Sequence, residues 1–109
     1  MNPADYEVAF KIISFAGNAK SSCMMAIREA REGNPEAATA LLVEADDSLH
    51  EAHNVQTSML TDEARGNPVP LNIILIHAQD HLSSAILLRD LADEFLALHA
   101  ANRATLATS

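Results

Sequence analysis

The sequence predicts an all-α protein, a single domain over residues 1–109 built as an antiparallel bundle of three long helices. Hydrophobic residues make up 49% of the chain, yet Trp is absent and only one Tyr and three Phe occur. The apolar content is therefore mainly Ala, Leu, Ile, Val and Met, a composition that suits packed helices better than sheets. Three Gly and four Pro interrupt the apolar pattern. With so few interruptions, long helices are expected over about residues 3–32, 35–65 and 70–101.

The first helix is expected to begin at Asn2, which can cap free backbone N–H groups, with Pro3 in the first turn. Gly17 interrupts the helix and would permit a close approach of another helix, and Gly33 ends it. The apolar residues follow steps of three and four, which place them on one face. That face consists of Val8, Ile12, Phe15, Ala19, Cys23, Ala26 and Ala30.

The second helix is expected to start at Asn34-Pro35, a repeat of the same cap signal, and the short link predicts an antiparallel neighbour. Pro68 and Pro70 cannot sit inside a helix and separate it from the third. Gln56 is a polar member of the apolar face. Its amide bonds either to His77 and its neighbours in the third helix or to backbone. The other members are Leu42, Ala45, Leu49, Ala52 and Met59.

The third helix is apolar on most sides, since 17 of the 28 residues from Leu71 to Leu98 are hydrophobic. Such a helix must be buried on most sides, and two neighbours cannot cover it. We therefore expect self-association around a shared axis through this helix. The segment after Asn102 is expected to fray. The expected core face is Leu71, Ile74, Ala78, Ala85, Leu88, Ala92 and Phe95, and Ile73, Ile76, Leu87, Leu91 and Leu98 lie outside it.

Composition excludes several classes of function. The formal net charge is −8 without any cluster of Lys and Arg, which argues against nucleic-acid binding and favours basic protein partners. The sequence contains no run of about 18 apolar residues, so no membrane span is predicted. The single cysteine, Cys23, excludes an internal disulfide, fits a buried apolar position and suits a reducing compartment. Because the first residues do not resemble a secretory signal, we expect a cytoplasmic protein.

A polar cluster interrupts the apolar third helix at His77, Asp80, His81 and Ser84. At 100° per residue these side chains share one sector of the helix. They are interpreted as a solvated notch, as a metal site, or as a site of histidine chemistry. A metal site would combine histidines at i and i+4 with a carboxylate, although no di-iron spacing is met. The second helix could add Asp46, Asp47, His50, Glu51 and His53 to it.

Histidine chemistry needs a neutral imidazole with one free lone pair and a partner that fixes the position of its proton. Such a ring can accept a phosphoryl group and pass it on. A neighbouring carboxylate and a second histidine can orient the ring and balance the changing charge. His77, Asp80 and His81 supply this combination.

The run His77-Ala78-Gln79-Asp80-His81-Leu82 resembles enzyme IIA of the lactose/cellobiose (N,N'-diacetylchitobiose) class of the bacterial phosphoenolpyruvate-dependent sugar phosphotransferase system. The resemblance covers about residues 5–99. Matches continue at 85–88 and 90–92, and upstream at 16–19, 51–53 and 56–57. The chain departs from the family at Ser83-Ser84, where Met is common. This departure bears on the sugar and on partner specificity.

The resemblance implies a phosphocarrier whose His77 takes a phosphoryl group on Nε2 from the phosphocarrier protein HPr and gives it to a cysteine of enzyme IIB. The membrane enzyme IIC then phosphorylates a β-disaccharide of the lactose, cellobiose or chitobiose class during uptake. His81, Gln79 and Gln56 would be supporting residues. The alternative is a non-catalytic helical regulatory or interaction module with the same fold.

The resemblance further implies a homotrimer of nine helices, with Asp80 of each subunit meeting its two symmetry mates around a structural divalent cation, usually taken as Mg²⁺. Three carboxylates in a poorly solvated interface repel unless they are protonated or neutralised by a cation. A hard ion with oxygen ligands suits that role.

Overall fold

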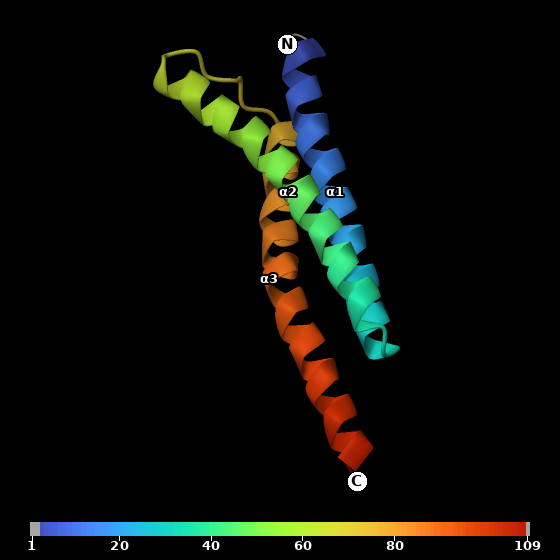
Figure 1. Ribbon diagram of the computed structural model, residues 1–109. Coiled ribbons are helices and arrows are strands. Elements are labelled where there is room, and N and C mark those ends of the chain that lie inside the picture. Colours follow the sequence, from blue (N-terminus) through green and yellow to red (C-terminus); the bar gives the residue numbers. More distant parts are fainter. Residues whose placement is uncertain (1–2, 109) are drawn as a thin grey trace.

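The computed structural model describes residues 3–108 as three α-helices: α1 (Pro3–Arg31), α2 (Pro35–Ala64) and α3 (Ile73–Thr108). Successive helices run in opposite directions in an elongated bundle 62 Å long (Figure 1). Helix α1 packs along both other helices, whereas α2 and α3 contact each other far less. The last turns of α2 diverge from the bundle, and the connection to α3 returns the chain to it (Figure 1). The expected all-α fold of three long helices is confirmed.

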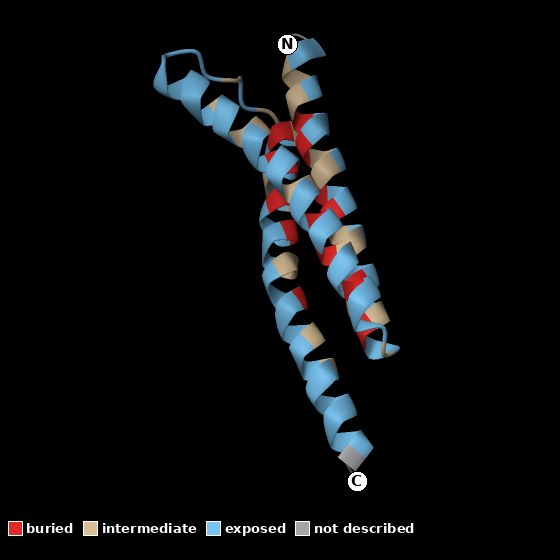
Figure 2. Ribbon diagram, in the orientation of Figure 1, coloured by how far each residue is buried: buried red, intermediate tan, exposed pale blue. Residues whose placement is uncertain are grey.

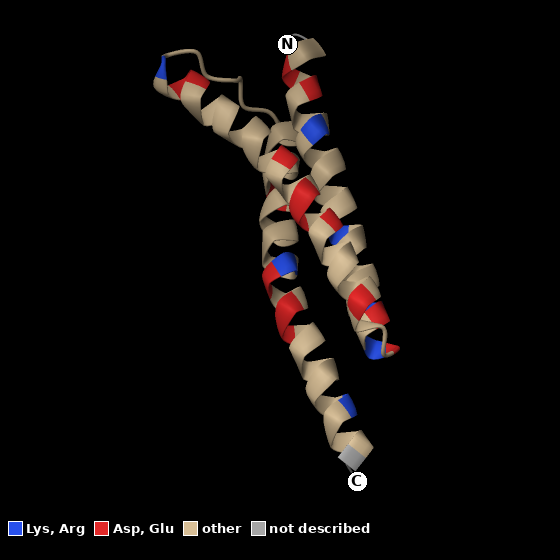
Figure 3. Cartoon of the chain, in the orientation of Figure 1, with Lys and Arg blue, Asp and Glu red and all other residues tan. Residues whose placement is uncertain are grey.

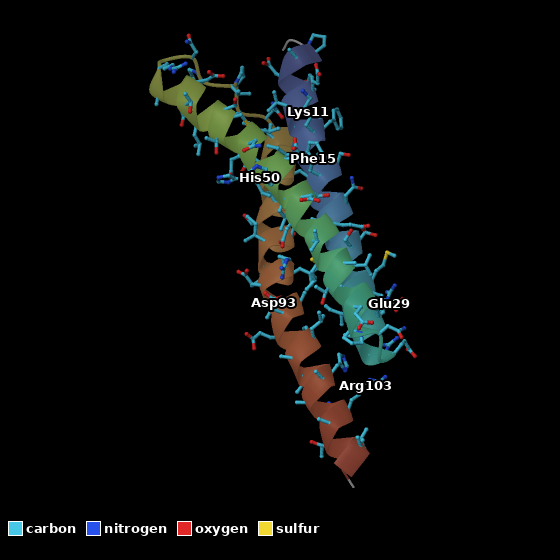
Figure 4. The ribbon with its side chains drawn as sticks, in the orientation of Figure 1. Lys11, Phe15, Glu29, His50, Asp93 and Arg103 are labelled. Carbon is cyan, nitrogen blue, oxygen red and sulfur yellow. The ribbon has the colours of Figure 1, made fainter. Side chains whose placement is uncertain are left out.

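The largest differences from the expected helix bounds concern α3. It begins at Ile73 and not at 70, because Asn72 precedes it as a cap: the Asn72 Oδ1 accepts a hydrogen bond of 2.8 Å from the Leu75 N–H. It continues to Thr108, so the expectation of an end near 101 was wrong. Ala is frequent in this segment, Gly and Pro are absent, and the Arg103 guanidinium donates to the Arg31 carbonyl at the end of α1 (Figure 4).

Asn caps were also expected at the starts of α1 and α2. The expected cap at Asn2 lies outside the described residues. Asn34 stands at the N-cap of α2, but its side chain makes no capping bond. The Asn34 Nδ2 donates instead to the Glu29 carboxylate at 2.8 Å, and so ties the turn to the end of α1. Pro35 occupies the first turn of α2, as expected from its fixed φ.

The core is a seam of small residues where α1 faces both partners, and Figure 2 shows the buried positions concentrated there. Small side chains allow the helix axes to approach closely. In α1 the buried residues include five of the seven expected positions, and Val8 and Phe15 are half-buried. The expected close approach at Gly17 was wrong, because a Cβ added there would meet nothing within 4 Å. The α1 core residues are Ala9, Ile12, Ala16, Ala19, Cys23, Ala26 and Ala30.

The expected core face of α3 is confirmed at its alanines and wrong at its ends. Ala78, Ala85 and Ala92 are buried, but Leu71 is 83% exposed because it precedes the helix. Phe95 is 41% exposed because it lies where α3 leaves its partners, and Figure 2 shows this end of α3 largely exposed. Leu75 and Leu82, which the pattern did not assign, complete the core.

A second face of α3 is apolar and uncovered in the single chain. Ile73, Ile76, Leu87, Leu91 and Leu98 are between 43% and 83% exposed. We refer to these five residues as the apolar stripe of α3. None of the helices within residues 3–108 has the length and apolar content that crossing a membrane requires. Figure 3 shows acidic residues spread over all three helices, in keeping with the negative net charge.

Candidate functional site

The two histidines of the polar cluster contact each other on α3. The Nε2 atoms of His77 and His81 are 3.0 Å apart. Their rings meet edge to face, with centroids 4.5 Å apart and planes at 90°. His77 is exposed and His81 is half-buried. One turn of helix therefore joins a histidine exposed to solvent with a more enclosed one.

Lys20 of α1 completes this arrangement. Its Nζ lies 3.1 Å from Nδ1 of His81, so His81 is held between a lysine on one side and His77 on the other. Sequence reasoning missed Lys20, which is 61 residues from His81. One signal for it existed: Lys20 is the sole charged residue between Lys11 and Arg28, and it follows the buried Ala19.

The surroundings of His81 favour its neutral form. Burial lowers the pKa of His81, the electrostatic effects of Lys20 and of the neighbouring His77 lower it further, and Asp80 acts in the opposite direction. A neutral imidazole has one N–H donor and one acceptor nitrogen. His81 can therefore accept a hydrogen bond on one side and donate one on the other.

Asp80 lies on the exposed side of α3 among apolar residues. At 100° per residue, the members of the apolar stripe fall within about 40° of Asp80 around the helix axis. Its carboxylate makes no hydrogen bond or ion pair to any other part of residues 3–108. Ser84, the last member of the polar cluster, bonds to its own helix: its Oγ donates to the carbonyls of Asp80 and His81 at 3.0 and 3.1 Å.

Gln56 and Gln79 contact each other and not the histidines. The Gln56 Nε2 of α2 donates to the Gln79 Oε1 of α3 at 2.7 Å. The Gln56 amide is therefore paired with a side chain of the candidate motif. The pair lies roughly on the opposite side of α3 from His77, about 160° around the axis. The structure thus brings Lys20, His77 and His81 together and separates the two glutamines from them.

The metal site within one chain is contradicted. In the described residues no three His, Cys, Asp or Glu side chains come together as a set of metal ligands. Asp46 instead receives two hydrogen bonds from Arg89, at 2.6 and 3.0 Å, and His53 lies 3.5 Å from the Thr57 hydroxyl. His50 points into solvent from α2 (Figure 4). The acidic and histidine residues of α2 are therefore surface groups.

Comparisons with known proteins agree with the resemblance seen in the motif. The sequence model of the family described as "PTS system, Lactose/Cellobiose specific IIA subunit" matches residues 7–100. The lactose-specific EIIA component of Streptococcus mutans serotype c is 39% identical over 92 residues, which cover 84% of this chain and 88% of that protein.

Solved structures share the fold. The crystal structure of the PTS cellobiose-specific enzyme IIA from Bacillus anthracis has a TM-score of 0.92 at 38% identity and covers 95% of each chain. The solution structure of the IIA(Chitobiose)-HPr complex from the N,N'-diacetylchitobiose branch of the Escherichia coli phosphotransferase system gives 0.77 at 33% identity, covering 89% of this chain and 94% of that one. The chain therefore belongs to the lactose/cellobiose-specific IIA family of the phosphotransferase system, and it is a phosphocarrier for sugars of the lactose, cellobiose and chitobiose class.

Proposed function

We propose that His77 is the residue that carries the phosphoryl group, and that Nε2 is the atom that binds it. The observation that carries this proposal is the pairing of the two histidines: His77 is exposed, and its Nε2 faces the Nε2 of His81 at 3.0 Å. His81 is the more enclosed of the two and is held on both sides, so it is the supporting residue. Gln56 and Gln79 support the site indirectly, because their bond ties α2 to the part of α3 that bears His77.

The transfer needs a lone pair on Nε2 of His77. As the bond from Nε2 to phosphorus forms, the bond from phosphorus to the donor's atom breaks, and that atom leaves with its electron pair. The proton on Nδ1 of His77 stays in place during attack, so the ring becomes positively charged and offsets the phosphoryl charge. Positioning and charge balance, and not acid–base chemistry on the phosphorus, are what the protein has to provide.

The partners follow from the family. The donor is HPr, a proposal supported by the complex of HPr with the related IIA(Chitobiose) protein. The acceptor is a cysteine of enzyme IIB, from which enzyme IIC phosphorylates a β-disaccharide during uptake. The site of action is then the cytoplasmic face of the membrane, where this chain associates peripherally with the permease. An acidic domain of net charge −8 attracts a basic donor surface.

The working assembly is a homotrimer around α3. Support comes from the apolar stripe of α3, whose five large residues are uncovered in the single chain. Asp80 lies within this stripe, so three copies of its carboxylate meet at a threefold axis. Because each chain contributes oxygen ligands only, a hard divalent cation, Mg²⁺, fits the set. Its role is to neutralise the carboxylates and not to take part in phosphoryl transfer.

The proposal is tested by phosphorylation. Incubation with phosphoenolpyruvate, enzyme I and HPr is expected to place an acid-labile, alkali-stable phosphate on the wild-type chain, located at His77 by mass spectrometry. His77→Ala should abolish the label. His53→Ala is the matched control, since His53 is an exposed histidine on α2, and it should be labelled as the wild type is. Unchanged labelling of His77→Ala would show that His77 is not the carrier.

A further inference from the structure

We infer that Lys20 is a positioning residue for phosphoryl transfer: its bond to Nδ1 of His81 fixes the proton positions of both histidines and keeps the lone pair of His77 on Nε2. This inference rests on the proposed role of His77. It follows from an unbroken chain of contacts, with Lys20 Nζ 3.1 Å from His81 Nδ1 and His81 Nε2 3.0 Å from His77 Nε2.

Lys20 determines which nitrogen of His81 carries the proton. A lysine ammonium has three N–H donors and no acceptor. The Nδ1 of His81 must therefore accept the hydrogen bond, and the single proton of the neutral ring resides on Nε2. Lys20 is half-buried on α1, whose buried Ala19 and Cys23 hold that face of the helix against its partners. Its ammonium is thus supplied from a fixed backbone and not from a loop.

The proton position of His81 in turn determines that of His77. Because the Nε2 of His81 carries the proton, it donates toward the Nε2 of His77, which must accept. The neutral His77 ring then holds its own proton on Nδ1 and its lone pair on Nε2. Without Lys20, His81 is free to place its proton on Nδ1, and both histidines lose a defined tautomer. Lys20 thus selects the nucleophilic nitrogen without touching the reacting atoms.

The same contacts serve the phosphorylated state. When Nε2 of His77 binds phosphorus, its lone pair is used, and the N–H of His81 is released to donate to a phosphoryl oxygen. The hydrogen bond to the lone pair is exchanged for a stronger one to an anion.

The test combines nuclear magnetic resonance with single-turnover kinetics. Long-range ¹H–¹⁵N spectra of the unphosphorylated wild type at fixed neutral pH should show the proton of His81 on Nε2 and that of His77 on Nδ1. Lys20→Met removes the ammonium and should leave His81 in a mixture of tautomers. Lys20→Arg keeps a donor without an acceptor and should retain the wild-type pattern. Lys11→Met is the matched control, because Lys11 lies on the same helix but pairs at 3.7 Å with Glu7.

Transfer from phospho-HPr should slow about ten- to a hundredfold in Lys20→Met, the size of a lost hydrogen bond to a charged group. The HPr concentration at half-maximal rate should stay unchanged, and Lys20→Arg should recover the rate. In a His81→Ala background, Lys20→Met should have no further effect, because the lysine acts through that ring.

The inference is overturned by a wild-type His81 protonated on Nδ1, a result that needs no variant. It is also overturned by unchanged spectra or rate in Lys20→Met, or by a rate loss that persists without His81. Each of these results, with label still on His77, leaves the proposed carrier intact. Conversely, a wild type that takes up phosphate elsewhere refutes the carrier assignment itself.

Discussion

At the scale of single residues, the site depends on contacts that bring distant parts of the sequence together. His77 and His81 are one helical turn apart, so their proximity followed from spacing alone. Lys20 did not follow, because its contact with His81 depends on how α1 and α3 are packed and rotated. Periodicity predicts which face of a helix is buried, but it does not determine which residue of a second helix lies opposite.

The Gln56–Gln79 bond makes a second residue-scale contact that can be tested. Both amides are half-buried, and each is the other's partner at 2.7 Å. Removing one leaves the other unsatisfied, which costs about 1–3 kcal/mol, whereas replacing both with apolar groups of similar shape is nearly neutral. Gln56→Leu should therefore lower the free energy of unfolding measured in urea, and Gln56→Leu/Gln79→Leu should recover most of the loss. A double variant less stable than either single one would contradict this account.

Cys23 is expected to be chemically inert in the native protein. It is fully buried in α1, and burial raises the pKa of its thiol; Arg89 acts against this, while Asp46 and Asp93 act with it. Because the thiolate is the reactive form, a raised pKa and burial together slow modification. Reaction with a thiol reagent at pH 8 should be slow for the folded chain and rapid in denaturant. Rapid modification of the folded chain, at the rate of a free cysteine, would show that this part of the core opens readily.

At the scale of helices, substitution of Gly by Ala is expected to have opposite effects on stability at Gly17 and Gly33. Gly17 lies inside α1 with open space where a Cβ would stand, so Gly17→Ala should raise stability by about 0.5–1 kcal/mol. Gly33 has φ of +86° in the turn, and an added Cβ would lie 2.6 Å from the Arg103 guanidinium. Gly33→Ala should therefore lower stability. Thermal unfolding of both variants checks the pair, and equal shifts in the same direction would refute the assigned environments.

The helices also show how far sequence patterns carry. Apolar spacing predicted three helices, and the turns at Gly33 and at Pro68 and Pro70 separate them as expected. The start of α3 does not follow from the apolar pattern, because its cap, Asn72, lies two residues beyond a proline and within the apolar segment. Its end does not follow either, because small and polar residues predict no helix there, whereas Arg103 bonds this segment to the end of α1. Local propensity was overridden in both places by side-chain bonds that spacing does not encode.

At the scale of the whole molecule, the decisive feature is that one apolar face of α3 is uncovered in the single chain. The sequence indicated this from the excess of apolar residues, and the structure locates it in the apolar stripe around Asp80. In the proposed function, one side of this helix presents His77 and His81 to the partner proteins, and the adjacent side brings copies of the chain together.

The assembly makes a prediction about the cation. In the proposed trimer, three Asp80 carboxylates repel one another unless a divalent ion neutralises them, whereas three leucines at the same place pack without one. Asp80→Leu should therefore remain trimeric in sedimentation experiments. Its thermal unfolding should be unaffected by a chelator, whereas chelation should lower the unfolding temperature of the wild type. Asp90→Leu serves as the control, since Asp90 is an exposed carboxylate of α3 outside the apolar stripe, and it should keep the wild-type response. Dissociation of Asp80→Leu into monomers would contradict this account. It would show that the Asp80 carboxylates hold the subunits together and do not merely need to be neutralised.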